Sequence, residues 1–334
     1  MANELQGRPH AAITVSVIIP TYNRPEGLLR LLDSLRGQTF PAEEMEIIVV
    51  DDGSTCSYID VMRTMDEMNA VYLQQPNSGE AVARNTGVAA GHGELLILLD
   101  DDMVLSPGYL AAMTAEHRLY PREILIGNMQ TVVSEGTGAY ARVMAPGLSP
   151  HVFGEVPFTE ALGGVMGIAR NIYLSLGGQR PVPDKNRGGW IDLDFSYRAY
   201  LAGYSFRRVQ AAMVTHHDWA NRDLQAACRR AVSISRLAPA LFQIHPGLAP
   251  YLPMFRDMHP IQWGKDSPRL VMRKMLRALS ASRWAIQIMA WLTGLFETQW
   301  PVPAILRRLY RWLQGAHIFR GYRDGIKQIK MEAQ

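Results

Sequence analysis

Four strongly apolar segments in the first 110 residues place the tightest constraint on the fold. The expected strands are 14–20 (TVSVIIP), 45–54 (MEIIVVDDGS, a strand that runs into a polar turn), 71–79 (VYLQQPNSG, a short strand and turn) and 94–102 (ELLILLDDD). Leucines at helical spacing occupy 25–38, a helical stretch follows residue 54, and 80–93 is a further expected helix. Strands that are apolar along their whole length and alternate with helices predict a parallel sheet with both faces covered.

Polar side chains gather where three of these strands end, at Thr21–Arg24, Asp51–Ser54 and Asp100–Asp102. The carboxyl ends of parallel strands share one edge of the sheet, and ligands bind beyond that edge. We therefore expect these three clusters to form one site.

Three consecutive carboxylates at Asp100–Asp102 repel one another at the end of an apolar strand, so we expect a cation to compensate them. In an extended chain Asp100 and Asp102 point to one side and Asp101 to the other. Two carboxylates on one side form half of a shell for Mg²⁺ or Mn²⁺. The alternative is a solvated turn before a helix over 106–117, with Ser106 as its N-cap.

The pattern changes after about residue 120. We expect strands over 123–133, 163–170 (GGVMGIAR) and 207–219, the last ending in a polar cluster, and a helix over 191–206 closed by Gly203. From about 222 onward the chain is mostly helical.

Four segments occur in a familiar order, namely VSVIIPTYNR (15–24), EIIVVDDGST (46–55), 77–102 ending in LLDDD, and WIDLDFSYRAYLAGY (190–204). Over about 14–218 the chain resembles the family 2 glycosyltransferases with the GT-A fold. The resemblance implies an α/β fold with a Rossmann-like, mostly parallel sheet flanked by helices, and a helical C-terminal extension. It implies a GT-A domain over 1–220, divided into a nucleotide-binding half (about 14–118) and an acceptor half (about 119–220). Residues 221–334 are the basic, amphipathic extension.

The same resemblance implies roles for individual residues. The nucleotide-sugar site would take Pro20, Thr21, Tyr22, Asn23, Asp52, Arg84, Asp100 and Asp101, with Asp52 at the base edge and Asp100 at the ribose or sugar. Asp102 would bind the divalent metal, Mn²⁺ or Mg²⁺. A histidine of THHDW would complete the metal shell, and of His216 and His217 we assign His217. A hydrogen-bonded structural histidine is the alternative.

Family members carry a Glu-Asp pair at the start of a later helix, and its Asp is the catalytic base. Here the pair reads Ile191-Asp192, so we assign Asp192 as base, with Asp194 as the alternative. The expected reaction is inverting transfer of a sugar from a nucleoside diphosphate, UDP first, to an acceptor hydroxyl. The acceptor would be a glycan, a lipid-linked molecule or another hydroxyl compound. Trp190 is either an acceptor-stacking residue or a packing residue.

Two other functions fit parts of the pattern. A sugar nucleotidylyltransferase has a related sheet, but PTYNRPEG (20–27) lacks the Gly-rich phosphate loop that it needs. A nucleotide-sugar binding protein without catalysis would explain the missing Glu before Asp192. Nucleic acid is not an expected partner, because no aromatic residues are interleaved along a sheet face.

Charge is unevenly distributed along the chain. Residues 265–334 carry 13 Lys or Arg and 4 Asp or Glu, whereas residues 1–264 carry 21 and 27. The longest uncharged run there, 284–296, is shorter than the roughly 20 residues of a membrane span. Contact of 265–334 with a membrane surface is one interpretation, and a solvated helical face or an oligomer contact are the others. Residues 1–12 lack a signal-peptide pattern, and two cysteines make no disulfide framework, so we expect a cytoplasmic protein, peripheral on the membrane or free of it.

Overall fold

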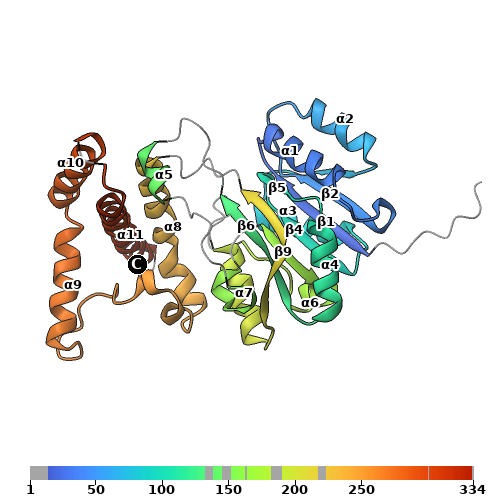
Figure 1. Ribbon diagram of the computed structural model, residues 1–334. Coiled ribbons are helices and arrows are strands. Elements are labelled where there is room, and N and C mark those ends of the chain that lie inside the picture. The colour runs from blue at the N-terminus through green and yellow to red at the C-terminus, as the bar shows by residue number, and fades with distance from the viewer. Residues whose placement is uncertain are drawn as a thin grey trace, which may run out of the picture. The chain divides into compact units, whose positions relative to one another are not determined.

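The computed structural model describes residues 14–131, 138–144, 152–161, 164–181, 190–216, 223–299 and 301–332. These residues form two compact units (Figure 1). The first unit comprises Met1–Gln130, Leu148–Pro181 and Ile191–His217, and the second comprises Thr131–Gly147, Val182–Trp190 and Asp218–Gln334. The first unit contains the β-sheet and the second is helical.

The first unit holds all the strands that the structure describes. They are β1 (Val15–Thr21), β2 (Met45–Asp51), β3 (Val71–Gln74), β4 (Leu95–Leu99), β5 (Met103–Leu105), β6 (Ile124–Thr131), β7 (Gly154–Val156), β8 (Val165–Ala169) and β9 (Phe206–His216). Its α-helices are α1 (Pro25–Arg36), α2 (Ile59–Glu67), α3 (Glu80–Ala90), α4 (Tyr109–Leu119), α6 (Arg170–Ser175) and α7 (Ile191–Leu201). Two 3₁₀ turns, η1 (Ala42–Glu44) and η2 (Phe158–Glu160), complete it.

These strands form one sheet in the order β3-β2-β1-β4-β8-β6-β9-β5, with β7 beside β9. The predicted parallel arrangement is confirmed for β3-β2-β1-β4. The antiparallel pairs are β4–β8, β6–β8, β5–β9 and β7–β9. In the β1–β2 register Thr21 lies opposite Asp51, so the polar segments after β1 and β2 begin at the same edge.

Burial explains why the apolar runs became strands and helices. Every residue of β1 and of β4 is buried, as a strand covered on both faces requires. Helix α1 begins at Pro25, which needs no amide partner in the first turn, and buries Leu28, Leu31, Leu32 and Leu35 on one face.

Ser106, the N-cap of the alternative interpretation, does not cap a helix. Residues 103–105 form β5 instead, which pairs with β9 so that Met103 lies opposite His216. The next helix, α4, therefore starts later, and its N-cap is Gly108. Asp101 and Asp102 form a turn between β4 and β5, so the alternation of an extended chain does not apply to them.

The second unit confirms the helical C-terminal region. Its helices are α5 (Ala139–Met144), α8 (Leu224–Ile244), α9 (Pro268–Ser280), α10 (Arg283–Gln299) and α11 (Pro303–Glu332), with 3₁₀ turns η3 (Ala249–Tyr251) and η4 (Pro253–Phe255). Helix α11 packs closely along α8 at two glycines. A Cβ at Gly321 would lie 2.1 Å from Ser235 Oγ, and one at Gly325 would lie 2.0 Å from the Arg236 carbonyl oxygen.

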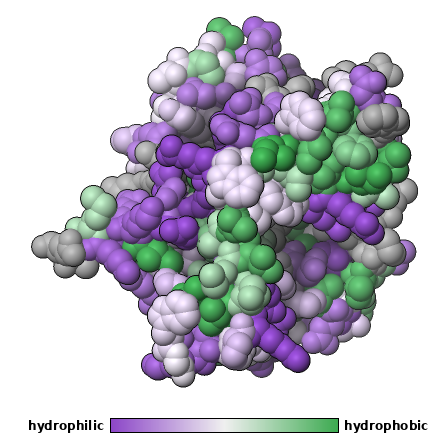
Figure 2. All heavy atoms as spheres, turned by 90° about the vertical axis from the view of Figure 1, so that its left-hand side faces the viewer, coloured by the Kyte–Doolittle hydropathy of each residue, from purple (hydrophilic) through white to green (hydrophobic). Residues whose placement is uncertain are grey.

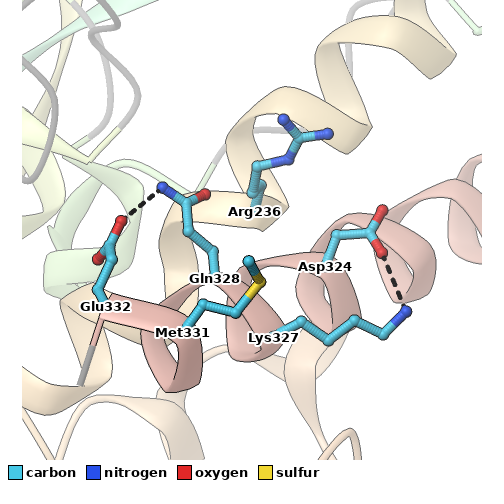
Figure 3. A pocket seen from close by; sticks show the side chains of 6 residues that line it. All are labelled: Arg236, Asp324, Lys327, Gln328, Met331 and Glu332. Atoms are coloured by element: carbon cyan, nitrogen blue, oxygen red, sulfur yellow. Dashed lines mark hydrogen bonds and ion pairs between the residues drawn. The ribbon is translucent and has the colours of Figure 1, made fainter. Parts of the chain in front are cut away.

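An open pocket lies beside the last turns of α11, where α8 contributes one residue (Figure 3). It is lined by Arg236, Asp324, Lys327, Gln328, Met331 and Glu332. Lys327 pairs with Asp324 at 3.8 Å, and Gln328 Nε2 donates to Glu332 at 2.9 Å. Two cationic and two anionic side chains give this pocket no net charge for a nucleoside diphosphate.

None of the helices in the described part of the chain combines the length and apolar character needed to cross a membrane.

Candidate active site

The carboxyl ends of β1 and β4 meet through Thr21 and Asp101. Thr21 Oγ1 donates to Asp101 Oδ2 at 2.8 Å and lies 2.9 Å from the Tyr58 hydroxyl. The Asp52 amide donates to the Thr21 carbonyl oxygen at 2.9 Å, so hydrogen bonds through Thr21 join the three strand-end clusters, as the topology predicts.

Arg84 of α3 is the buried cation of this edge, with 1% of its side chain exposed. Its Nη2 pairs with Glu80 at 2.8 Å and with Asp100, while its Nη1 pairs with Asp192 at 3.0 Å. One guanidinium therefore connects the end of β4 with the start of α7. The planar fork of arginine suits such multiple contacts with carboxylates.

Gln179 supports the same cluster. Its Nε2 donates to Asp192 Oδ1 at 3.1 Å, and its Oε1 accepts from Arg84 Nη1 at 3.2 Å. Asp192 Oδ1 is consequently held by two donors, the Arg84 guanidinium and the Gln179 amide.

Glycine is needed beside Asp100. The Gly164 amide donates to Asp100 Oδ2 at 3.2 Å, and the Asp100 amide donates back to the Gly164 carbonyl at 3.1 Å. A Cβ at Gly164 would lie 2.2 Å from Asp100 Cγ, so any larger residue would displace that carboxylate.

Asp102 and His216 form the part of the site with metal-ligand chemistry. Asp102 Oδ2 lies 3.3 Å from His216 Nε2, because β5 and β9 pair next to these residues. Asp102 Oδ1 is buried and has no hydrogen-bond partner within the described residues. Such an oxygen is costly unless something binds it, and a divalent cation fits an Asp oxygen beside an imidazole nitrogen. His217, the histidine assigned from the sequence, lies outside the described residues.

Within the described ranges no group of three or more His, Cys, Asp or Glu side chains is arranged to hold a metal ion. Two side chains there, Asp102 and His216, have the chemistry of metal ligands and lie in contact. A cation held by two protein ligands keeps coordination positions for other oxygens.

Arg24 provides a second cation. Its Nη1 lies 3.2 Å from Asp101 Oδ1 and 3.1 Å from Asp102 Oδ2, and the arginine side chain is largely exposed. Two arginines therefore compensate the three carboxylates, as expected. Arg84 pairs with Asp100, and Arg24 pairs with Asp101 and Asp102.

The loops after β1 and β2 are tied together. Asn23 has a φ of +53°. Its side-chain Oδ1 accepts from the backbone amide of Thr55 at 2.8 Å, and its backbone amide donates to Ser54 Oγ at 2.8 Å. Asparagine tolerates this left-handed conformation better than most residues. Pro20 is buried in β1, whereas the Tyr22 side chain points into solvent.

The Asp52 carboxylate binds the loop before α3. It accepts from the amides of Ser78 and Gly79, each at 2.8 Å, and from Gln75 Nε2 at 2.7 Å. These bonds fix the segment from which α3 carries Glu80 and Arg84 into the site.

The two acidic residues of α7 differ in accessibility. Asp194 is fully buried and pairs with Arg198 at 2.9 Å, and Arg198 in turn donates to the carbonyl of Gly178 at 2.8 Å. Asp192 is one-fifth exposed. Trp190 lies in the second unit, where its indole donates to the Ile234 carbonyl at 3.0 Å and packs against Phe255. This contact is that of a packing residue.

Burial and charge shift the carboxylate pKa values in different directions. Burial raises the pKa of Asp100 although Arg84 opposes it, and burial raises the pKa of Asp101 to about 6 although Arg24 opposes it. Burial also acts to raise the pKa of Asp102, but His216 and Arg24 outweigh it and hold that pKa below the usual value. Asp102 is therefore the carboxylate of the three that stays ionised most readily.

Comparisons with known proteins show what the chain is similar to. Residues 16–160 match the family described as Glycosyl transferase family 2. Glycosyltransferase GlyA of Streptococcus pneumoniae is 29% identical over 150 residues, and validoxylamine A glucosyltransferase of Streptomyces hygroscopicus is 38% identical over 117 residues.

The match to glycosyl transferase family 2 covers residues 16–160, less than half of the chain. The alignments cover 44% and 34% of the chain, but they span 21% and 28% of the length of GlyA and of the validoxylamine A enzyme, less than a third of either relative. Gln179, Asp192 and His216 lie beyond the family 2 match, and their contacts with Arg84 and Asp102 place them beside the matched residues.

Solved structures extend the likeness in fold over most of the chain. TarS residues 1–349 from S. aureus, crystallised with UDP, gives a TM-score of 0.53 at 18% identity, covering 96% of this chain and 92% of that one. The mannosyltransferase PcManGT of Pyrobaculum calidifontis, with GDP-Man and Mn²⁺, gives 0.58 at 18% identity, covering 92% and 86%. The fold is thus the GT-A fold.

Sequence reasoning missed three residues of this site: Arg24 as the partner of Asp101 and Asp102, Glu80, and Gln179. Glu80 could have been found, because it stands four residues before Arg84 on a predicted helix, where an acidic and a basic residue meet. Gln179 carries no signal in the sequence, since its position in the site depends on the loop between α6 and α7.

Proposed function

We propose that this chain is a metal-dependent inverting glycosyltransferase that moves a sugar from a nucleoside diphosphate to an acceptor hydroxyl. The observation that carries the proposal is the Arg84 cluster. It ties Asp100, at the edge where α/β sheets bind nucleotides, to Asp192 on α7. Donor site and base would thus sit on one rigid cluster. The family 2 match supports the same reaction class.

The donor would be held at the ends of β1, β2 and β4. Pro20, Thr21, Tyr22, Asn23 and Asp52 would surround the base and ribose, and Asp100 and Asp101 would lie toward the sugar. A UDP-sugar is the first candidate because TarS binds UDP and UDP-GlcNAc, and GDP-mannose is the second because PcManGT binds it.

Asp102 and His216 would hold the divalent cation, Mn²⁺ or Mg²⁺, and His217 stays a prediction. Support comes from the 3.3 Å contact between Asp102 and His216, the partnerless Asp102 Oδ1 and the Mn²⁺ in the PcManGT structure. When bound, the cation would supply positive charge that stabilises the departing diphosphate.

Asp192 would act as the general base. As the acceptor oxygen forms its bond to the anomeric carbon, the bond from that carbon to the diphosphate oxygen breaks, and Asp192 takes the hydroxyl proton. Arg84 and Gln179 would hold the carboxylate in place during this step. Asp194 is a poorer candidate, because it is buried against Arg198.

The acceptor would be a hydroxyl of a glycan, of a lipid-linked molecule or of another compound. Residues 1–220 would carry donor and acceptor binding, and residues 221–334 would form a separate helical part with another role. No nucleic-acid partner is proposed.

Changing Asp192 to Asn tests the reaction. Asparagine keeps the size of the side chain and can still accept from Arg84, so the protein should fold and bind nucleotide as wild type does. We expect nucleoside diphosphate release from the donor in the presence of acceptor to fall by about 10²–10⁴-fold, the usual contribution of a general base. The assay is coupled nucleotide release, with nucleotide affinity measured in parallel.

Asp60→Asn, at an exposed carboxylate of α2, is the matched control and should keep full turnover. Equal turnover by Asp192→Asn and wild type would refute the base assignment. Nucleotide binding without turnover in wild type would favour a binding protein that lacks catalysis.

A further inference from the structure

Helix α9 exposes a row of large apolar side chains to solvent and buries a lysine. Lys274 is buried, where it pairs with Asp266 at 2.7 Å and donates to the Pro260 carbonyl at 3.3 Å. A surface helix ordinarily turns its apolar stripe to the core. In α9, Lys274 lies on the inward side beside the half-buried Leu270 and Val271, and further apolar side chains lie on the outward side.

The outward side of α9 carries Met272, Met275, Leu276 and Leu279, which are 51–58% exposed. Their spacing of three, four and seven residues places them in one stripe along the helix. Exposed large apolar side chains are ordinary when scattered, but a continuous stripe marks a binding surface.

A stripe of arginines runs beside this apolar stripe. Arg269, Arg273 and Arg277 follow at intervals of four residues on the adjoining side of the helix. Arg273 pairs with Asp257 at 2.5 Å and Arg277 donates to the Arg256 carbonyl at 2.6 Å, so both are held in place. The sequence of α9 contains no Asp or Glu.

Helix α10 follows α9, contacts it, and also exposes large apolar side chains. Trp284, Ile288 and Trp291 lie on one side of it and are 52–66% exposed. Its one acidic residue, Glu297, accepts a hydrogen bond from the Tyr310 hydroxyl. Tryptophan is the side chain that most favours the boundary between water and lipid. In Figure 2, the face on the α9 and α10 side of Figure 1 shows hydrophobic groups bordered by hydrophilic ones.

We propose that the outward faces of α9 and α10 form a docking surface for a lipid bilayer with anionic headgroups. The apolar stripe would enter the headgroup and acyl boundary, and the arginines would contact lipid phosphates. A transmembrane role does not fit, since no described helix is long and apolar enough to cross a membrane.

Charge selects this partner over a second copy of the chain. Residues 265–334 carry 13 Lys or Arg and 4 Asp or Glu, so a symmetric contact between two such surfaces would bring like charges together. An anionic lipid surface complements the same charges. Binding of this kind requires no sugar transfer and can therefore be measured without donor or acceptor.

Co-sedimentation of the full chain with vesicles tests the proposal. Wild type should bind phosphatidylcholine vesicles that contain phosphatidylglycerol, bind phosphatidylcholine alone far more weakly, and lose binding as salt is raised. Leu276→Gln combined with Leu279→Gln should weaken binding by about tenfold or more. Arg269→Gln should weaken binding to the anionic vesicles by about fivefold.

The matched control is Leu119→Gln combined with Leu201→Gln, at two well-exposed leucines of α4 and α7 in the first unit. It should bind vesicles as wild type does. Absence of wild-type binding to anionic vesicles would overturn the proposal, as would unchanged binding by the Leu276 and Leu279 variant. A wild-type oligomer that this variant dissociates, without vesicle binding, would identify a second copy as the partner instead.

Discussion

Arg84 is a buried cation whose guanidinium contacts Glu80, Asp100 and Asp192. Three carboxylates around one arginine leave an excess of negative charge in a partly buried site. The arginine is therefore as important for holding these side chains together as for any contact with a ligand, because without it the carboxylates would repel each other.

Replacing Arg84 with Ala should lower the free energy of unfolding by about 3 kcal/mol, because removing one partner leaves buried charges uncompensated. Arg84→Lys keeps the charge but not the planar fork, and it should fall between Ala and wild type. Denaturant unfolding measures both. Arg63→Ala removes a well-exposed arginine that pairs with Asp60 and should change stability by less than about 1 kcal/mol. Equal losses at Arg84 and Arg63 would contradict this role.

Glu80 should make stability depend on pH. Arg84 lowers its pKa, but burial and the charges of Asp100 and Asp192 outweigh that effect and raise the pKa to about 7, from 4.5 in the unfolded chain. The folded state then binds more protons than the unfolded state between these values, so the unfolding free energy should fall as pH rises from 4.5 to 7. Since 36% of the Glu80 side chain is exposed, the unfolding free energy should change only modestly with pH over this range.

Glu80→Gln removes this titration, and its stability should fall less than that of wild type over the same pH range. Thermal unfolding at a series of pH values is the measurement. Parallel curves for the two proteins would rule out Glu80 as the source of the slope.

The sequence predicted the strand-end residues well because their position follows from topology. Thr21, Asp52 and Asp100 stand directly at the ends of buried runs, and parallel strands bring such ends together. It did not predict which cation compensates which carboxylate, since Arg24, Arg84 and Gln179 reach their partners through side-chain orientations and a loop that no periodicity encodes.

At the scale of elements, α8 and α11 depend on close backbone approach. A Cβ at Gly325 would lie 2.0 Å from the Arg236 carbonyl oxygen, which belongs to a helix backbone and cannot move away cheaply. Glycine spacing of four residues, from Gly321 to Gly325, places both close contacts on one side of α11.

Gly325→Ala should therefore cost about 1–3 kcal/mol of stability through overpacking. Gly315 of the same helix has no atom within 4 Å of its would-be Cβ. Gly315→Ala is the matched control, and it should raise stability by up to about 1 kcal/mol because alanine favours the helix. Chemical denaturation measures the unfolding free energy of both variants. If both substitutions stabilised the protein, the close packing of α11 on α8 would be contradicted.

Long elements were predictable from their patterns, and short ones were not. The fully apolar runs of β1, β2 and β4 and the leucine spacing of α1 each extend over several residues. Strand β5 has three residues, Met103–Leu105, which show no period. It pairs with β9, and the next helix has Gly108 rather than Ser106 as its N-cap. A pairing partner more than a hundred residues away cannot be read from local sequence.

At the scale of the whole molecule, the sheet of the first unit holds the carboxylate site, and the second unit carries the excess of positive charge. The overall charge of +3 conceals this division. The negative charge of the carboxylate site attracts cations, and the positive charge of the helices attracts an anionic surface.

The most direct test of the central claim is thermal unfolding of wild type and Asp102→Ala with UDP, GDP or dTDP, each with and without Mn²⁺. A ligand that binds the native state at 100 times its Kd stabilises it by about 2.7 kcal/mol. We predict that one nucleotide raises the melting temperature of wild type when Mn²⁺ is present, and that Asp102→Ala loses this shift while an Asp60→Ala control keeps it. No shift with any nucleotide, or an equal shift in Asp102→Ala, would contradict a metal-dependent donor site at this edge of the sheet.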